Sequence, residues 1–458
     1  MEDTHRTVGH ADLGPSVRRL AATLVQRGVS PGDRLAVVLP NCAAAVELYL
    51  ACALVGAIWV GINPAAPAAE RDRQCALVGP VLTIADNMLS ALETEQTETF
   101  DGAPPQLSTP CAIGFSSGTT GTPKAIVHTR AGVSLVAAVL AQSQLRAGDR
   151  VGVILPMSIH NLIAVGALPS LFAGATCVPV RRMDAAGVAA ACHDLGLSRV
   201  NALVPATIYD LVHDDTIPPE ALASLRTAGT GAAGLSEALR EAFEAKFGCR
   251  LVASYGMTEA PGVVCIEDPD VPHTAGASGT PLPHLTVTAC DVRGKPLLTG
   301  QEGEIIVGPA DSGPWADLYS PAVGRWTADG LLRRPATEKT FRTGDYGWID
   351  ADGAVHVTGR SADVIVRGGV NVNAAELESV LAQLPAVRDV AVVGAEDTRL
   401  GQRIVAFIEP SNTAVDAESL RRCAREVLSH GKVPDEFVVT ELPRNAMGKV
   451  ARAQLLRR

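Results

Sequence analysis

The sequence predicts an α/β protein with a large N-terminal domain, a β-barrel-like subdomain and a small α+β C-terminal domain. Short apolar strands alternate with helical segments up to about residue 254, which implies parallel-rich sheets flanked by helices. From about Leu285 the segments become β-like, with a Gly-containing turn between them. A second unit of strands and helices begins near Arg360. The length of 458 residues also exceeds one ordinary domain and predicts two or three.

Each element of the first domain follows from a local pattern. Leu20, Leu24 and Val25 share one side of the first helix, and Gly28 ends it. The strands are short apolar runs, typical of buried strands. Residues 87–111 are polar and contain prolines, so we expect a surface connection there. In chain order the expected elements are helix 15–28, strand 34–39, helix 42–55, strand 57–62, strand 82–86, helix 131–141, strand 151–155, helix 161–172, strand 176–180, helix 184–195, strand 199–204, strand 225–227, helix 236–247 and strand 251–254.

A predicted hinge at residues 360–363 divides the chain into two domains. This division gives an N-terminal domain of residues 1–359 and a C-terminal domain of residues 364–458. The remaining expected elements are strands 285–289 and 304–307, then strand 363–366, helix 374–384, strand 390–393, strand 403–408, helix 417–428 and strand 436–439.

Composition and charge exclude several classes of function. The net charge of −10 and the absence of a Lys/Arg cluster disfavour a nucleic-acid partner. Ten scattered cysteines without a CxxC pair favour buried thiols over a disulfide framework or a zinc site. The most apolar run, residues 48–62, is too short to span a membrane, and the first residues lack an apolar signal region. We therefore expect a soluble, cytoplasmic protein.

Residues 112–125 carry the clearest chemical signal. An apolar, strand-like entry leads into a run where hydroxyls and glycines alternate, and Lys124 closes it. Glycine lets backbone N–H groups approach a ligand closely, while hydroxyls and an ammonium group bind the oxygens of an anion. The combination suits a triphosphate, although the spacing is not that of a Walker loop.

Two other interpretations of this stretch remain open. A run of Ser, Thr and Gly is often a solvated loop. The run also contains G-x-S-x-G, the nucleophile elbow of serine hydrolases, with Ser116 as the nucleophile. An elbow needs a helix directly after the serine, but Gly121, Thr122 and Pro123 stand where that helix would begin. The pattern therefore favours anion binding.

Six motifs in a fixed order resemble those of the adenylate-forming superfamily, which includes acyl- and aryl-CoA ligases, peptide-synthetase adenylation domains and firefly luciferases. The resemblance extends from about residue 34 to the C-terminus. It implies a small, mobile C-terminal domain and a reaction of carboxylate with ATP to acyl-adenylate and pyrophosphate, followed by transfer to a thiol. The motifs are Ser-Ser-Gly-Thr-Thr-Gly-Thr-Pro-Lys at 116–124, Tyr-Gly-Met-Thr-Glu at 255–259, Thr-Gly-Asp at 343–345, Gly359-Arg360, Gly368-Gly369 and Pro-Arg-Asn-Ala-Met-Gly-Lys at 443–449.

The resemblance implies a role for each motif. Lys449 and Thr258 would contact the reacting α-phosphate, and Glu259 would hold Mg²⁺, a cation that prefers carboxylate oxygen. Asp345 would accept hydrogen bonds from the ribose hydroxyls. Each residue alone also has an ordinary interpretation, such as a turn aspartate or a solvated lysine, but the ordered series favours function. The residues implied to bind ATP or AMP are Ser116, Ser117, Gly118, Thr119, Thr120, Gly121, Thr122, Lys124, Gly231, Ala232, Ser254, Tyr255 (adenine stacking), Gly256, Met257, Asp345 and Arg360 (ribose).

The small domain would carry the second half-reaction. By resemblance, Gly368 and Gly369 line a tunnel for the pantetheine arm after this domain rotates, although a Gly-Gly turn is the ordinary alternative. Relatives usually have Asp or Lys two residues after the hinge arginine, whereas this chain has Ala362 followed by Asp363. We hypothesise that Asp363 or the backbone alone serves as the hinge anchor.

Four residues are candidates for the acid pocket: His160, Asn161, Tyr209 and Thr230. Residues 156–161 contain no aspartate to pair with an ammonium group, so an α-amino acid is disfavoured as substrate. An apolar pocket with few polar groups suits an aromatic or aliphatic acid.

The predicted function is that of an ATP-dependent carboxylic acid–thiol ligase, most simply an acyl- or aryl-CoA synthetase. It would use ATP, Mg²⁺ and coenzyme A on a small carboxylic acid, as a monomer or homodimer. The phosphopantetheine of a carrier protein stays open as acceptor, because it presents the same arm as coenzyme A. A non-catalytic binding homologue is disfavoured, because Lys449 and Glu259 are both present.

Overall fold

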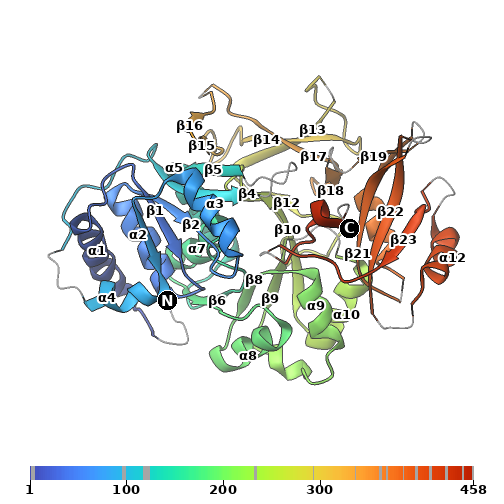
Figure 1. Ribbon diagram of the computed structural model, residues 1–458, viewed down its shortest axis with the longest axis horizontal. Coiled ribbons are helices and arrows are strands. Elements are labelled where there is room, and N and C mark those ends of the chain that lie inside the picture. The colour runs from blue at the N-terminus through green and yellow to red at the C-terminus, as the bar shows by residue number, and fades with distance from the viewer. Residues whose placement is uncertain are drawn as a thin grey trace.

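Two large sheets form the body of the N-terminal domain, and a separate small domain follows at the C-terminal end (Figure 1). The computed structural model describes residues 1, 6–94, 99–116, 124–231, 235–291, 293–335, 337–360, 364–367, 370–384, 386–397, 401–411, 415–428, 432–445 and 448–455.

The first sheet has a parallel half and an antiparallel half. Strands β3, β1, β2 and β4 run parallel, and β5, β15 and β16 continue the sheet antiparallel. Its order across the sheet is β16 (Gly330–Arg333), β15 (Gly324–Thr327), β5 (Lys124–Thr129), β4 (Pro110–Ser116), β2 (Ile58–Gly61), β1 (Arg34–Val38) and β3 (Leu82–Ala85).

The second sheet repeats this plan. Strands β7, β6, β8, β9 and β10 run parallel, and β11 and β12 are antiparallel additions. The carboxyl ends of the parallel strands therefore meet along one edge, where ligands bind in such sheets. The order is β12 (Thr280–Pro281), β11 (Gly262–Ile266), β10 (Arg250–Met257), β9 (Thr227–Thr230), β8 (Arg199–Leu203), β6 (Arg150–Val153) and β7 (Thr176–Pro179).

The helices of this domain flank the sheets (Figure 1), and three of them are capped by a side chain at the N-terminus. Thr129, Asp184 and Ser236 each accept a hydrogen bond from the third helical amide, which satisfies an otherwise unpaired donor. The helices are α1 (His10–Gln26), α2 (Ala43–Val55), α3 (Ala68–Val78), 3₁₀-helix η1 (Asp86–Met88), α4 (Leu89–Thr94), α5 (Arg130–Gln144), α6 (His160–Leu162), π-helix η2 (Ile163–Ala167), α7 (Leu168–Phe172), α8 (Ala185–Leu195), α9 (Pro205–His213), 3₁₀-helix η3 (Pro219–Leu222) and α10 (Glu237–Phe247).

A four-stranded antiparallel sheet follows, and the C-terminal domain has a sheet of its own. In Figure 1 the C-terminal domain lies at the right, and the chain end returns toward the centre of the molecule. The elements are β13 (Leu285–Cys290), β14 (Gly303–Pro309), β17 (Phe341–Ile349) and β18 (Val355–Arg360), then β19 (Val364–Arg367), β20 (Val370–Asn373), α11 (Ala374–Leu381), β21 (Val387–Asp397), β22 (Gly401–Pro410), α12 (Ala417–Val427), β23 (Glu436–Val439) and α13 (Arg452–Leu455).

The predicted fold class is confirmed, but several local predictions are wrong. Residues 87–111 include most of η1, all of α4 and the start of β4, instead of forming only a surface connection. β5, α9 and β11 were not predicted, and β9 lies at 227–230 instead of 225–227. No helix in the described ranges combines the length and apolar character that crossing a bilayer requires. The ten cysteines are free thiols.

Candidate active site

The predicted phosphate loop lies between two antiparallel strands. β4 enters it and β5 leaves it, with Ser116 paired opposite Lys124, whose side chain is exposed. The first described residues after the loop form the strand β5, whereas a nucleophile elbow leads from its serine into a helix. The Ser116 hydroxyl donates to Glu259 Oε1 at 3.1 Å, joining two motifs far apart in sequence. The other predicted loop ligands lie outside the described residues: Ser117, Gly118, Thr119, Thr120, Gly121 and Thr122.

Gly114, two residues before Ser116 in β4, lies close to side chains from three other segments of the chain. A Cβ built on Gly114 would be 3.1 Å from Cβ of His160, 3.1 Å from Cγ2 of Thr258 and 3.7 Å from Nε2 of His128. These distances leave little room for a side chain at this position. The glycine therefore allows Thr258 and His160 to approach the same strand.

A hydrogen bond joins the proposed adenine and ribose residues. The Tyr255 hydroxyl donates to Asp345 Oδ2 at 2.6 Å, and the Asp345 side chain is buried. Burial, and then the nearby Asp345 carboxylate, raise the pKa of Tyr255, so the phenol stays protonated and donates. Arg360 at the end of β18 is paired in register with Asp345 of β17. Tyr255 lies within β10, not after a strand, because β11 extends the pairing of β10 to Met257.

The remaining predicted nucleotide residues line the same part of the second sheet. A Cβ built on Gly231 would lie 3.4 Å from Ser254 Oγ, which donates to the carbonyl of Thr230 at 3.3 Å. Gly256 has no room for a side chain, because its Cβ would lie 2.0 Å from the Gly262 carbonyl oxygen. Met257 is buried beside them, and Ala232 lies outside the described residues.

Lys449 is held by a tight hairpin of the C-terminal domain. Its amide donates to Asn445 Oδ1 at 3.1 Å, and its carbonyl accepts from the Asn445 amide at 2.8 Å. A Cβ on the neighbouring Gly448 would lie 3.5 Å from Val204, which follows β8 directly. Leu203 of β8 pairs with Thr230 of β9, so the hairpin lies over the carboxyl ends of these strands. The Lys449 side chain is exposed.

Family models identify the chain. The model described as AMP-binding enzyme matches residues 1–311, and the model for the AMP-binding enzyme C-terminal domain matches residues 376–449. The chain belongs to the AMP-binding enzyme family.

Relatives of this AMP-binding enzyme extend over nearly its whole length. It is 32% identical over 489 residues to the sulfoacetate–CoA ligase of Cupriavidus necator, covering 98% of this chain and 92% of the relative. It is 29% identical over 469 residues to a feruloyl-CoA synthase of Amycolatopsis sp, covering 98% and 93%. ATP-bound MatB from Rhodopseudomonas palustris has a TM-score of 0.86 at 25% identity, covering 100% and 94%. Apo MatB has a TM-score of 0.73 at 24% identity.

The comparisons confirm the predicted family and reaction class. The enzyme is an AMP-forming acid–thiol ligase, which activates a carboxylic acid with ATP as an acyl-adenylate and transfers the acyl group to coenzyme A. The roles of individual residues, the hinge at 360–363 and the domain limits stay predictions. Residues 361–363 and the glycine pair Gly368 and Gly369 lie outside the described residues.

Three of the four candidate acid-pocket residues have a buried polar atom without a partner in the described part of the AMP-binding enzyme. These atoms are His160 Nδ1, Asn161 Oδ1 and Thr230 Oγ1. Buried polar atoms are normally hydrogen-bonded, so each needs a ligand or a water. Tyr209 is different, because its ring stacks on His213 at 4.0 Å and lies 5.8 Å below the Arg388 guanidinium.

Sequence reasoning missed two buried residues beside this site. Asn41, just after β1, accepts from the Met157 amide at 2.7 Å. Its Nδ2 lies within 3.3 Å of four carbonyls, at the last residue of β6 and just after β6 and β7. It therefore ties the first sheet to the segment that leads to His160. Its position after a strand and a proline was the available signal. His128 stacks on His160 with ring centroids 4.4 Å apart.

His128 predicts acid sensitivity. Burial lowers its pKa to about 3, whereas in the unfolded chain it titrates near about 6.5. Between these values the unfolded state binds the extra proton, so stability falls as the pH falls below about 6.5. We expect its contribution to the unfolding free energy to fall by roughly 1.4 kcal/mol per pH unit in this window.

Urea titrations at pH 7, 6 and 5 test this. His128→Phe should give a shallower loss of stability with falling pH than the wild type. Gln26→Ala, which changes an exposed, non-titrating side chain on α1, is the control and should leave the slope unchanged. Equal slopes for the wild type and His128→Phe would contradict the assignment.

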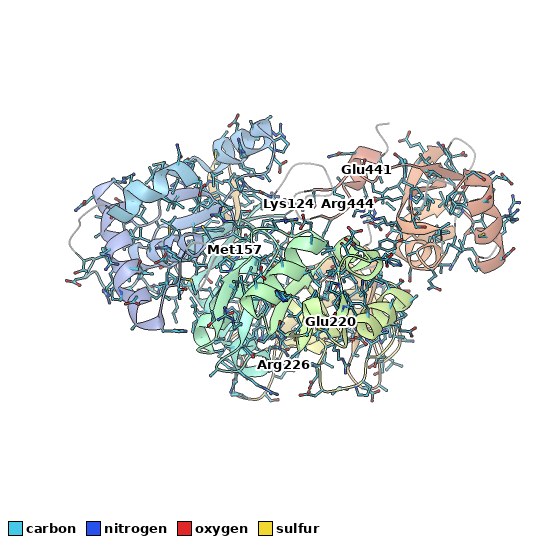
Figure 2. The ribbon with its side chains drawn as sticks, turned by 90° about the horizontal axis from the view of Figure 1, so that it is seen from below. Lys124, Met157, Glu220, Arg226, Glu441 and Arg444 are labelled. Atoms are coloured by element: carbon cyan, nitrogen blue, oxygen red, sulfur yellow. The ribbon has the colours of Figure 1, made fainter. Side chains whose placement is uncertain are left out.

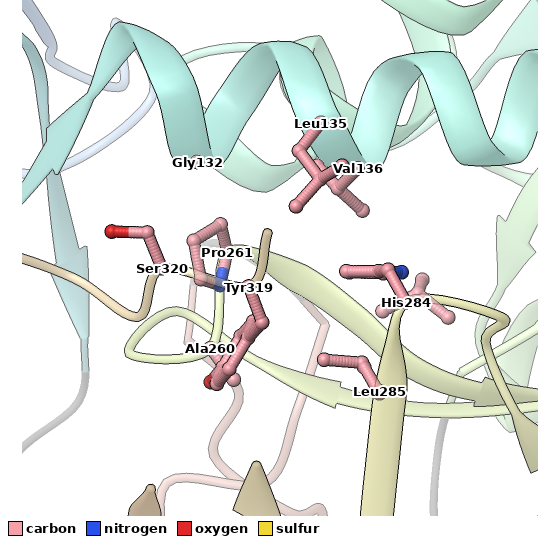
Figure 3. A pocket seen from close by; sticks show the side chains of 10 residues that line it. Gly132, Leu135, Val136, Ala260, Pro261, His284, Leu285, Tyr319 and Ser320 are labelled. Atoms are coloured by element: carbon pink, nitrogen blue, oxygen red, sulfur yellow. The ribbon is translucent and has the colours of Figure 1, made fainter. Parts of the chain in front are cut away.

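A small cavity under α5 is separate from these residues (Figure 3). In Figure 3 the helix side chains approach it from one side and His284, Tyr319 and Pro261 from the other. None of the proposed nucleotide ligands that the structure describes lines it, so the cavity is not part of the proposed nucleotide site. It is lined by Gly132, Leu135, Val136, Ala260, Pro261, Val263, His284, Leu285, Tyr319 and Ser320.

Proposed function

We propose that this ligase activates an aromatic or aliphatic carboxylic acid that has no α-amino group. The segment from Pro156 to Asn161 has no carboxylate, and its His160 is buried with burial lowering its pKa, so this wall of the pocket is neutral. A neutral wall does not pair with a substrate ammonium group. His160, Asn161 and Thr230 supply the polar atoms that would orient the acid.

The observation that supports the proposed site best is the joining of distant motifs by hydrogen bonds. Ser116 bonds Glu259 and Tyr255 bonds Asp345, across 143 and 90 positions of sequence. In this proposal ATP lies across these two pairs, with its phosphates at the Ser116 end and its ribose at Asp345.

Both reactants are anions, so catalysis rests on positioning and charge neutralisation. Mg²⁺ fits the oxygen donors Glu259 and Ser116, and when bound it would neutralise phosphate charge. Lys124 adds a fixed positive charge at the phosphate loop. Lys449, delivered by the small domain, would contact the charge that develops at the α-phosphate and the carboxylate.

We propose that the structure has the orientation used for adenylation. Gly448 lies against Val204 at the carboxyl edge of the second sheet, so Lys449 is already at that edge. The TM-score is higher to ATP-bound MatB than to apo MatB, which supports this proposal. Both structures are of the same protein, so the difference between the scores comes from its conformation. Rotation about residues 360–363 would then exchange Lys449 for Gly369 and open the thiol-acceptor tunnel.

Pyrophosphate release over a panel of carboxylic acids tests the proposal. Aryl and aliphatic acids should give acid-dependent release, and amino acids should give none. With coenzyme A present, the acyl-CoA should accumulate faster than with an equal concentration of a phosphopantetheinyl carrier protein. Release with amino acids alone would contradict the acid class, and faster loading of the carrier would identify that protein as the acceptor.

A further inference from the structure

A chain of ion pairs connects α9 of the large domain to the hairpin that carries Lys449. Arg388 of β21 donates through Nη2 to both oxygens of Asp210 on α9, at 2.7 and 3.0 Å. Through Nη1 it donates to Glu409 Oε1 at 3.0 Å. Its guanidinium carbon lies 5.8 Å from the Tyr209 ring, within the range of a cation–π contact. One nitrogen of Arg388 therefore contacts both carboxylate oxygens of Asp210, and the other contacts Glu409, in charge-assisted hydrogen bonds, which are the stronger kind.

Glu409 links Arg388 to Arg444, which contacts the hairpin. The Glu409 side chain is buried, and its second oxygen accepts from Arg444 at 2.9 Å. Arg444 also bonds Asp389 at 2.8 Å and donates through Nη1 to the Gly448 carbonyl at 3.2 Å. Figure 2 shows Arg444 on the side of the C-terminal domain that faces the large domain. Ion pairs and one hydrogen bond thus connect Asp210, through Arg388, Glu409 and Arg444, to the carbonyl of Gly448. Gly448 is the residue directly before Lys449.

The two ends of this path have different exposure. Arg388 and Asp210 side chains are 34% and 43% exposed, so water reaches the contact between the domains. Glu409 is 9% exposed, so the contacts inside the C-terminal domain are the more permanent ones. When the small domain rotates, the pair that must break is therefore the outer one. A half-exposed ion pair is strong enough to bias an equilibrium and weak enough to open.

We propose that the Asp210–Arg388 pair is a latch that holds the small domain in the orientation where Lys449 reaches the adenylation site. Arg388 is then a positioning residue, acting through Glu409 and Arg444 on the Lys449 hairpin. The proposal rests on the proposed role of Lys449. It makes the latch specific for the first half-reaction, because transfer to the thiol needs the other orientation.

The test separates the two half-reactions in single-turnover experiments. Adenylation is followed from acid and ATP, and thioester formation from synthetic acyl-adenylate and coenzyme A. Arg388→Gln and Asp210→Asn should each slow adenylation by about threefold to fivefold, while thioester formation stays unchanged or becomes faster. Arg388→Lys keeps the charge and should recover part of the rate. Arg182→Gln, which removes an exposed Arg–Asp pair within the large domain, is the matched control and should change neither step.

A double variant tests whether the two residues act as a pair. If they do, Arg388→Gln with Asp210→Asn should slow adenylation by about the same factor as either single change. Losses that multiply in the double variant to about tenfold or more would overturn the latch, as would equal slowing of both half-reactions. If Lys449→Ala leaves adenylation unchanged, the proposed function itself fails. If Lys449→Ala slows adenylation but the latch variants do not, only the latch fails.

Discussion

Lys449→Ala should slow acyl-adenylate formation by about two to three orders of magnitude. The lysine is exposed on a hairpin that lies over the carboxyl ends of β8 and β9, with Gly448 against Val204. Its charge would meet the negative charge that grows in the transition state, and ground-state ATP is held mainly by groups of the large domain. ATP binding should therefore weaken only severalfold, so the loss should appear in the rate at saturating ATP.

Acid-dependent exchange of pyrophosphate into ATP measures this step directly. Lys295→Ala removes another exposed lysine, on a turn after β13, and should leave exchange unchanged. Thioester formation from synthetic acyl-adenylate should also survive in Lys449→Ala, because that step uses the rotated domain. Unchanged exchange in Lys449→Ala would show that the lysine has another role.

The alternation of strands and helices was predictable because each parallel strand is buried on both faces and reads as an apolar run. The failures have local physical causes. β5 directly follows the phosphate loop, and its apolar run extends only from Ala125 to Val127, so the strand was not recognised. α9 begins with Pro205 at its first turn, a helix-start signal, but within this segment Tyr209 was considered only as an acid-pocket residue.

The site was predictable to the extent that its residues come in motifs. Glu259 and Asp345 could be named from the sequence, because each stands in a short pattern. Asn41 gave only one signal, its position after a strand and a proline, and Arg388 gave none, because their partners lie more than 100 positions away. Nothing in the residues around Arg388 distinguishes an interdomain ion pair from a solvated charge. Only the packing of β21 against α9 reveals it.

Asp345→Ala should lower kcat/KM for ATP by about 10²-fold to 10³-fold. The carboxylate is buried, and its Oδ2 already accepts the Tyr255 hydroxyl, so it is oriented before nucleotide arrives. Two ribose hydroxyls bonded to a charged acceptor are worth about 1.5–3 kcal/mol each. The loss should fall mostly on the KM for ATP, because ribose contacts form in the ground state as well as in the transition state.

Tyr255→Phe is the control that separates nucleotide binding from local folding. It removes the hydroxyl bond to Asp345 but leaves the aromatic ring and the carboxylate, so KM for ATP should rise only severalfold. The difference between the variants then measures what the carboxylate contributes beyond its bond to Tyr255. If Tyr255→Phe is as damaging as Asp345→Ala, the carboxylate acts through the tyrosine, and its assignment to the ribose is wrong. If Asp345→Ala changes the KM for the acid instead, the nucleotide lies elsewhere on this edge of the sheet.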